Sequence, residues 1–159
     1  MNPLVSVCIP AYNSAVYIEK TMESVLAQKY EHLELVVVDD CSGDETVEIV
    51  ERIRERDSRV RLVRNETNLG MTGNWNKCLE EARGEYIKLI CADDILYPDS
   101  IEKELAALLK HPEVAIAMSD TALIDENGVR TGCFRRYPRS GVLDGKKVAK
   151  RALIFKSFF

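Results

Sequence analysis

The first 110 residues alternate between continuous apolar runs and amphipathic segments. The apolar runs, which are typical of strands buried on both faces of a sheet, lie at residues 4–9, 33–38, 59–63 and 85–91. The segments that follow them carry apolar residues at helical spacing and predict four helices. The order β-α-β-α-β-α-β-α predicts an α/β fold, namely a Rossmann-like open, mainly parallel sheet with helices on both faces.

Local signals set the expected bounds of these helices. The first is predicted over residues 15–28, and the segment Ser42-Gly43-Asp44-Glu45 fits a capping box that would open the second. The third is predicted over residues 73–83, with Gly84 as the glycine that closes its last turn. Pro98 would occupy the first position of the fourth helix.

The pattern weakens after the fourth helix. Residues 114–117 and 121–124 are strand-like, and residues 125–128 predict a hairpin turn. Residues 146–159 predict a basic amphipathic helix that ends on two phenylalanines. An exposed apolar end of this kind indicates a C-terminal truncation, and in a truncated chain it would favour a homodimer contact.

Composition narrows the functional classes. The chain has 159 residues, of which 46% are apolar and 30% charged. It contains no apolar run of the ~18–20 residues that a membrane helix needs, and its first residues lack the pattern of a secretory signal. Five cysteines without C-x-x-C spacing indicate free thiols and a reducing cytoplasm, and two isolated histidines indicate neither a metal site nor a catalytic base.

The formal net charge is −4, but the charged residues are unevenly distributed along the chain. Residues 1–127 carry 13 basic and 25 acidic side chains, which excludes a nucleic-acid surface there. Residues 128–159 carry nine basic side chains and one acidic side chain. Two interpretations of this basic tail stay open: a solvated loop and helix, or a surface that attracts an anionic lipid-linked acceptor or an anionic membrane.

Candidate chemistry lies just after the strands, because ligands of open α/β sheets bind beyond the carboxyl ends of the strands. The segment Pro10-Ala11-Tyr12-Asn13 follows the first apolar run, and the pairs Asp39-Asp40 and Asp93-Asp94 follow the second and fourth. The sequence contains neither G-x-G-x-x-G nor G-x-x-x-x-G-K-[ST], which disfavours a usual dinucleotide site and excludes a P-loop.

Two carboxylate pairs at one edge of a sheet repel each other unless a cation or ligand donors offset their charge. Oxygen ligands favour Mg²⁺ or Mn²⁺ bridged to a diphosphate, and the ring of Tyr12 offers a face on which a base can stack. Taken singly, an Asp-Asp pair is more often a helix cap or a solvated turn, and a tyrosine is more often a packing residue. The combination predicts a nucleoside-diphosphate site.

Five stretches, in order and in register, resemble family 2 glycosyltransferases of the GT-A fold, and the resemblance covers residues 4–125. The stretches are VSVCIPAYN at residues 5–13, LVVVDDCSGDET at 35–46, NLG with NWN within 68–76, ARGEYI at 82–87 and ADDI at 92–95. The resemblance implies that Pro10, Ala11 and Tyr12 line the nucleoside pocket, with Tyr12 against the base. It also implies that Asp40 accepts a hydrogen bond from uracil N3–H.

The last stretch implies the metal site. Asp93 would contact the ribose or a metal-bound water, and Asp94 would bind Mg²⁺ or Mn²⁺ directly. Many relatives carry an aspartate two positions before Asp93, where this chain has Cys91, so metal binding would rest on the two aspartates. Gly70 and Asn76 would lie on the side of the sugar diphosphate.

The resemblance also implies a function. Members of this family transfer a sugar from a nucleotide-sugar donor, usually with inversion, while a metal assists departure of the diphosphate. For this chain we expect a UDP-sugar donor, a glycan or lipid-linked acceptor in cell-envelope polysaccharide biosynthesis, and a cytoplasmic location that can extend to the inner face of the membrane. Residues 1–127 would bind the donor, and residues 128–159 would begin the acceptor side.

No catalytic residue is assigned, because the family's catalytic base would lie beyond residue 159. A nucleotide-binding fragment without transfer activity is therefore the alternative to a complete enzyme. A nucleotidyltransferase is a third, less favoured alternative, because such a protein would carry a glycine-rich basic loop after the first strand.

Overall fold

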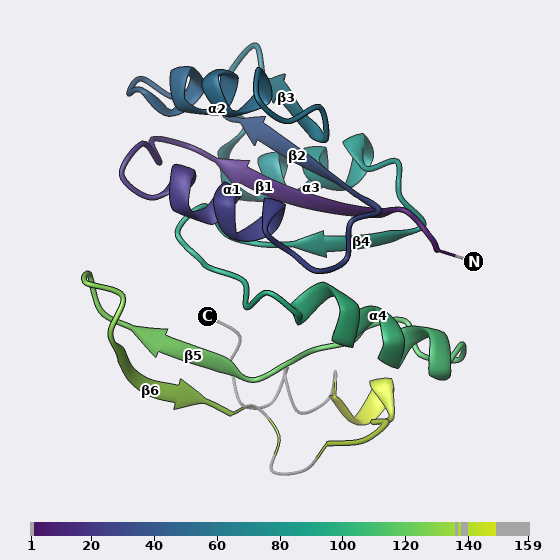
Figure 1. The fold of residues 1–159 in the computed structure, drawn as a ribbon. Helices are drawn as coiled ribbons and strands as arrows, with labels where there is room; N and C mark the ends of the chain where they lie inside the picture. The colour runs from purple at the N-terminus through teal and green to yellow at the C-terminus, as the bar shows by residue number, and fades with distance from the viewer. Residues whose placement is uncertain (1, 136, 138–139, 149–159) are drawn as a thin grey trace. The chain divides into compact units, whose positions relative to one another are not determined.

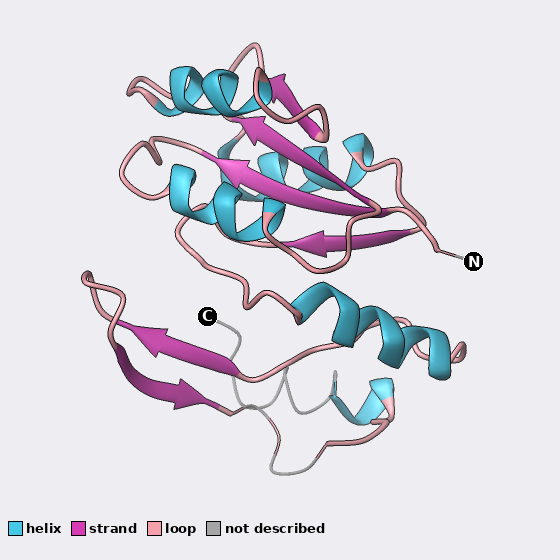
Figure 2. Cartoon of the chain, viewed as in Figure 1, coloured by secondary structure: helices cyan, strands magenta, loops and turns pink. Residues whose placement is uncertain are grey.

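The structure is a computed structural model that describes residues 2–135, 137 and 140–148. The chain divides into two compact units, Met1–Ala106 and Ala107–Phe159, which are described separately. The predicted division at residue 127, between a donor-binding part and the start of the acceptor side, is a functional one. The compact units do not test it, and it stays a prediction. Figures 1 and 2 show the elements, which are β1 (Val5–Ala11), α1 (Ile18–Leu26), β2 (Leu33–Asp39), α2 (Thr46–Arg54), β3 (Val60–Arg64), α3 (Gly70–Glu81), β4 (Tyr86–Leu89), α4 (Ser100–Lys110), β5 (Thr121–Ile124) and β6 (Arg130–Phe134).

The first unit is built on a parallel four-stranded sheet in the order β3-β2-β1-β4. The chain winds outward from β1 through β2 to β3 and then returns to place β4 on the other side of β1. The order therefore reverses between β1 and β4, which is where open α/β sheets bind ligands. This arrangement confirms the predicted fold class.

β1 reaches further at its carboxyl end than β4 does. It pairs with β2 up to the register Ala11↔Asp39, but its pairing with β4 ends at Cys8↔Leu89. Pro10 lies in the extension, and strand alternation turns its nitrogen toward the side that β4 has left. Proline, which has no backbone N–H, is tolerated there because no neighbouring strand would accept a hydrogen bond from this position. The early end of β4 opens a crevice beside β1.

Two apolar layers cover the sheet. Val7 and Ile9 of β1 face a buried cluster to which α1, α2 and α4 contribute, whereas Cys8 faces a smaller cluster that contains Cys78 of α3. Figure 1 shows α3 on the opposite face of the sheet from α1. Helices therefore lie on both faces, as predicted, and the continuous apolar runs are buried from both sides.

Three predicted helix signals are wrong in detail. α2 begins at Thr46 without a capping box, because the Ser42 hydroxyl accepts a hydrogen bond from the backbone N–H of Asn13 at 2.9 Å instead. α4 begins at Ser100, two residues after Pro98, whose carbonyl accepts a hydrogen bond from the backbone N–H of Lys29 at 2.9 Å. Both residues serve contacts with other parts of the chain.

Gly84 does not close α3, which ends at Glu81. A Cβ at position 84 would lie 2.6 Å from the backbone nitrogen of Ser6 and 2.7 Å from the carbonyl oxygen of Leu4. Glycine is required there because the backbone passes directly against β1, a reason that differs from helix termination.

The second unit contains an antiparallel hairpin of β5 and β6. Its turn holds Gly128 at a φ of +78°, which confirms the predicted turn. Residues 114–117 are not a strand, and Ile116 is 72% exposed, because no neighbouring strand pairs with them among the described residues. Residues 145–148 form a helical turn, and the rest of the predicted tail helix lies outside the described residues. Within the described residues, no helix is long and apolar enough to cross a bilayer.

Candidate functional site

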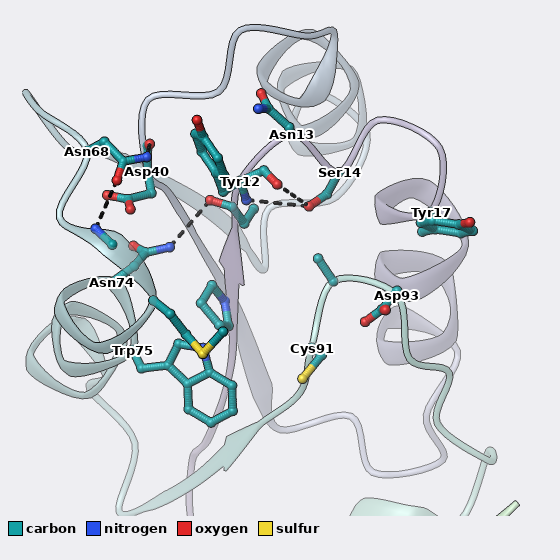
Figure 3. Close-up of a pocket in the computed structure, with 15 residues that line it drawn as sticks. Tyr12, Asn13, Ser14, Tyr17, Asp40, Asn68, Asn74, Trp75, Cys91 and Asp93 are labelled. Carbon is teal, nitrogen blue, oxygen red and sulfur yellow. Dashed lines mark hydrogen bonds between the residues drawn. The ribbon is translucent and has the colours of Figure 1, made fainter. Parts of the chain in front are cut away.

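A cleft of about 560 Å³ lies at the carboxyl ends of β1, β2 and β4, within the first unit. Figure 3 shows Asp40 and Trp75 on one side of it, and Tyr17 and Asp93 on the other. The cleft lies at the position where the strand order reverses, so topology and shape indicate the same place.

The structure brings the predicted ligand-binding residues together at this cleft. They come from three segments that lie far apart in sequence, and they are Pro10, Ala11, Tyr12, Asp40 and Asp93, with Gly70 beside them. Asp94, the predicted metal ligand, follows Asp93 but does not line the cleft surface. None of the lining side chains in the described part of the chain is a lysine or an arginine.

Asp40 is buried, with 2% of its surface exposed, and its carboxylate is held in one orientation. Oδ1 accepts hydrogen bonds from Nδ2 of Asn65 and from the backbone N–H of Leu69, both at 2.8 Å. The backbone carbonyl of Asp40 accepts another from Nδ2 of Asn68 at 3.1 Å. Because Oδ1 already serves two donors, Oδ2 is the oxygen through which this side chain can accept a further donor.

Asn74, which joins the ends of β1 and β2, is not among the site residues predicted from the sequence. Its Nδ2 donates to the carbonyls of Val38 at 3.0 Å and Ala11 at 3.3 Å, and its Oδ1 accepts from Nδ2 of Asn65 at 3.1 Å. Its position four residues before the buried Cys78 was an available signal, because residues i and i+4 share a helix face.

Asn76, which the resemblance placed near the sugar diphosphate, is exposed and does not line the cleft. It lies two residues after Asn74, so the helix turns it about 200° away from the buried face. The asparagine that reaches the carboxyl edge of the sheet is therefore Asn74.

The loops after β1 and β2 are joined by two hydrogen bonds. In each of them a side chain of one loop accepts from the backbone of the other. Oδ1 of Asn13 accepts from the backbone N–H of Gly43 at 2.8 Å, and Oδ2 of Asp44 accepts from that of Ala15 at 3.0 Å. The loop carrying Tyr12, which is 54% exposed, is thereby held against the loop that follows Asp40. The Tyr12 ring is therefore available for stacking, and these hydrogen bonds restrain the backbone that carries it.

Burial raises the pKa of the Asp44 carboxyl, but hydrogen bonds reverse that effect. They come from the Thr46 hydroxyl and from the backbone N–H groups of Ala15 and Thr46, and together they hold the pKa below its ordinary value. The ionised form of Asp44 is therefore the form that joins the two loops.

Asp93 and Asp94 lie in a turn after β4 that is closed by a hydrogen bond of 3.2 Å from the Asp94 N–H to the Cys91 carbonyl. One carboxylate oxygen of each aspartate and the Cys91 sulfur lie within 4.8 Å of one another. Partial desolvation of the carboxylate and the charge of Asp93 raise the pKa of Asp94. Burial, followed by the charges of Asp94 and Asp93, raises the pKa of the Cys91 thiol. The three donors can converge on one cation.

Comparison with known families gives a match over residues 6–149 to the family described as glycosyl transferase family 2. TuaG of Bacillus subtilis, named as a teichuronic acid biosynthesis glycosyltransferase, is 37% identical over 142 residues, which make up 89% of this chain and 56% of TuaG. EpsE of the same organism, also named as a glycosyltransferase, is 36% identical over 80% of this chain and 46% of its own length. The chain spans about half the length of these relatives.

Solved structures agree with this result. TarS of S. aureus in complex with UDP-GlcNAc superposes with a TM-score of 0.63 at 33% identity, over 68% of this chain and 32% of the TarS chain. The mannosyltransferase PcManGT of Pyrobaculum calidifontis, in complex with GDP-Man and Mn²⁺, also has a TM-score of 0.63 at 32% identity, over 67% of this chain and 32% of its own.

Proposed function

The chain belongs to glycosyltransferase family 2, and from this premise we propose that its cleft binds a UDP-sugar, with a divalent cation, for transfer of the sugar to an acceptor. The observation that carries the proposal is the composition of the cleft. Two segments bring the carboxylates of Asp40 and Asp93 to it, and no lysine or arginine is among its described lining residues. A diphosphate bound there requires a cation to offset its charge.

The hydrogen bonding of Asp40 favours uridine over guanosine. Guanine presents two adjacent donors, N1–H and the N2 amino group, which match a carboxylate with both oxygens open. Uracil presents one donor, N3–H, and Asp40 has Oδ1 occupied by Asn65 and Leu69, which leaves Oδ2. The exposed ring of Tyr12 would stack on the base. TarS in complex with UDP-GlcNAc is the neighbour whose nucleotide agrees with this assignment.

The donor atoms after β4 fit a divalent cation. Their separations, within 4.8 Å, allow Asp94 to hold Mg²⁺ or Mn²⁺ while Asp93 contacts the ribose or a water on the ion. When bound, such an ion stabilises the charge of the departing diphosphate. The neighbour PcManGT, in complex with Mn²⁺, supports a divalent ion in this fold.

We further propose that transfer proceeds with inversion, which requires a carboxylate base facing the acceptor hydroxyl. Asp40 is assigned to the base of the nucleotide and Asp93 to the ribose or a water on the ion, so neither is proposed as the catalytic base. The name of TuaG, which places that relative in teichuronic acid biosynthesis, supports an acceptor belonging to a cell-envelope polysaccharide or its lipid-linked precursor.

Calorimetric titration with UDP, GDP and dTDP, each with and without Mn²⁺, tests the proposal. We expect UDP to bind more tightly than GDP and its affinity to rise with Mn²⁺. The Asp94→Asn variant should lose the Mn²⁺ effect, whereas Glu48→Gln, which removes an exposed acid on α2, should keep it. A panel of UDP-sugars then tests transfer or hydrolysis. Absence of UDP binding with or without Mn²⁺ would refute the proposal.

A further inference from the structure

Three polar side chains are directed into the protein. Two lie on one face of α1, and the third lies just after its C-terminal end. Thr21, Ser24 and Gln28 are spaced three and four residues apart, so they share one face. Thr21 and Gln28 are 1% and 5% exposed, and both lie next to the apolar side chains by which α1 packs on the sheet. Buried polar groups in such surroundings are retained only with hydrogen-bond partners.

Their partners lie in the segment that carries the aspartate pair. The Thr21 hydroxyl donates to the carbonyl of Ala92 at 2.8 Å, immediately before Asp93. Oγ of Ser24 accepts from the backbone N–H of Leu96 at 3.1 Å, shortly after Asp94. The two contacts therefore hold the segment at both ends of the pair.

Gln28 continues the same contact toward α4. Its Nε2 donates to the carbonyl of Tyr97 at 2.8 Å, and its Oε1 accepts from the backbone N–H of Ile101 at 3.1 Å. The neighbouring Lys29 donates its backbone N–H to the carbonyl of Pro98 at 2.9 Å. The segment from Ala92 to the start of α4 is thus anchored along its length to one helix.

The anchoring matters because this segment belongs to no strand or helix. Residues 91–99 have no ladder hydrogen bonds, and the adjacent negative charges of Asp93 and Asp94 favour a wider separation of the two carboxylates. Tyr17, which precedes α1, lines the same cleft as Asp93. The helix therefore connects the wall of the cleft to the turn that carries the aspartates.

We propose that Thr21 is a positioning residue for the Asp93–Asp94 pair, assisted by Ser24, and that its hydroxyl sets the affinity of the cleft for UDP with a divalent cation. The inference rests on the proposed function, which assigns the two aspartates to the ribose and the cation. Thr21 itself contacts neither ligand. A valine would fill the same volume, so the loss of the hydroxyl can be measured separately from packing.

The test compares Thr21→Val with Thr21→Ser. Affinity for Mn²⁺ is measured by electron paramagnetic resonance of the free ion in the presence of UDP, and affinity for UDP by calorimetry. We expect Thr21→Val to weaken Mn²⁺ binding about tenfold or more, which is the usual effect of removing a partner that orients a metal ligand. Thr21→Ser retains the donor and should bind within about threefold of wild type, inside the context-dependent spread of a single hydrogen bond.

Ser6→Ala is the matched control, because Ser6 is also fully buried and its hydroxyl bonds Glu34 and Gly84 at the opposite end of β1. It should lower the thermal midpoint and leave Mn²⁺ affinity unchanged. Equal Mn²⁺ affinity in Thr21→Val and wild type would overturn the inference, as would an equal loss in Ser6→Ala. If Thr21→Val does not fold, Ser24→Ala is judged by the same criteria. Absence of Mn²⁺-dependent UDP binding by the wild-type protein would instead overturn the proposed function.

Discussion

Nδ2 of Asn65 donates to Oδ1 of Asp40 over 2.8 Å, and the same amide group donates to Oδ1 of Asn74 over 3.1 Å. The first bond orients the buried carboxylate of Asp40 at the carboxyl end of β2. The second connects the same amide group to Asn74, which joins β1 and β2. A side chain constrained in this way presents one defined oxygen to a ligand, which is the basis for the choice of nucleoside.

Replacing Asp40 by asparagine should weaken UDP binding about tenfold or more, equivalent to about 1.4 kcal/mol. The amide oxygen would keep the hydrogen bonds from Asn65 and Leu69, so the new amino group would face the ligand and oppose uracil N3–H. Calorimetry with UDP measures the loss. Asp57→Asn, which removes an acid paired with Arg59 away from the cleft, is the control and should bind UDP normally. Unchanged UDP affinity in Asp40→Asn would remove Asp40 from the site.

Replacing Gly84 by alanine should destabilise the fold by about 1–3 kcal/mol, the usual range for forcing atoms into a packed site. The added Cβ would lie 2.6 Å from the Ser6 nitrogen, and both of the closest atoms belong to backbone that cannot rotate away. Urea unfolding measures the change. Gly145→Ala is the control, because a Cβ there meets nothing within 4 Å, and it should leave stability nearly unchanged. Wild-type stability in Gly84→Ala would contradict the close approach.

Asp44 should contribute stability that disappears in acid. Its folded pKa lies below its unfolded value, so its contribution is complete above the unfolded pKa of about 3.8 and is lost as the pH falls through the folded pKa. Wild type should therefore exceed Asp44→Asn in unfolding free energy at pH 7, by about 0.5 kcal/mol because Asp44 is exposed and solvent screens its charge. The difference should persist at pH 5 and narrow below pH 4 (urea unfolding at each pH). A difference that stays constant down to pH 3 would exclude a role for the ionised carboxylate.

Two of the cysteines should resist alkylation in the native protein. Burial raises the pKa of Cys8 to about 12 and that of Cys78 to about 12, and both side chains are fully buried. Iodoacetamide at pH 8 should therefore modify Cys41 and Cys133, which are exposed, before these two. Peptide mapping by mass spectrometry gives the order, and unfolding in urea should remove the difference. Modification of Cys8 as fast as Cys133 would show that the core opens readily.

The strands could be predicted because a strand buried on both faces has consecutive apolar residues in its sequence. Val36, Val37 and Val38 are consecutive and all fully buried, so continuous apolar sequence alone identified β2. Helix ends were less predictable. The Ser42 hydroxyl fits a cap by sequence, but it bonds Asn13 from 29 residues away, and a local rule cannot weigh such a competitor.

Much of the candidate site was predictable for a topological reason. Residues that directly follow parallel strands meet at one edge, so Tyr12, Asp40 and Asp93 could be placed together before their contacts were known. Asn74 and Thr21 could not be found in this way. Each lies within a helix, and each donates its hydrogen bonds to backbone carbonyls, which every residue type provides.

The sequence by itself determined the fold class, the succession of strands and helices along the chain and the group of polar residues that follow the strands, because apolar periodicity is a property of neighbouring residues. The order of the strands within the sheet came from the tertiary structure. Tertiary structure decided which oxygen of Asp40 can accept a ligand donor and which helix holds the aspartate turn. Those outcomes depend on hydrogen bonds such as that from Thr21 to Ala92, across 71 residues, whose geometry exists only once the helix has packed against the sheet.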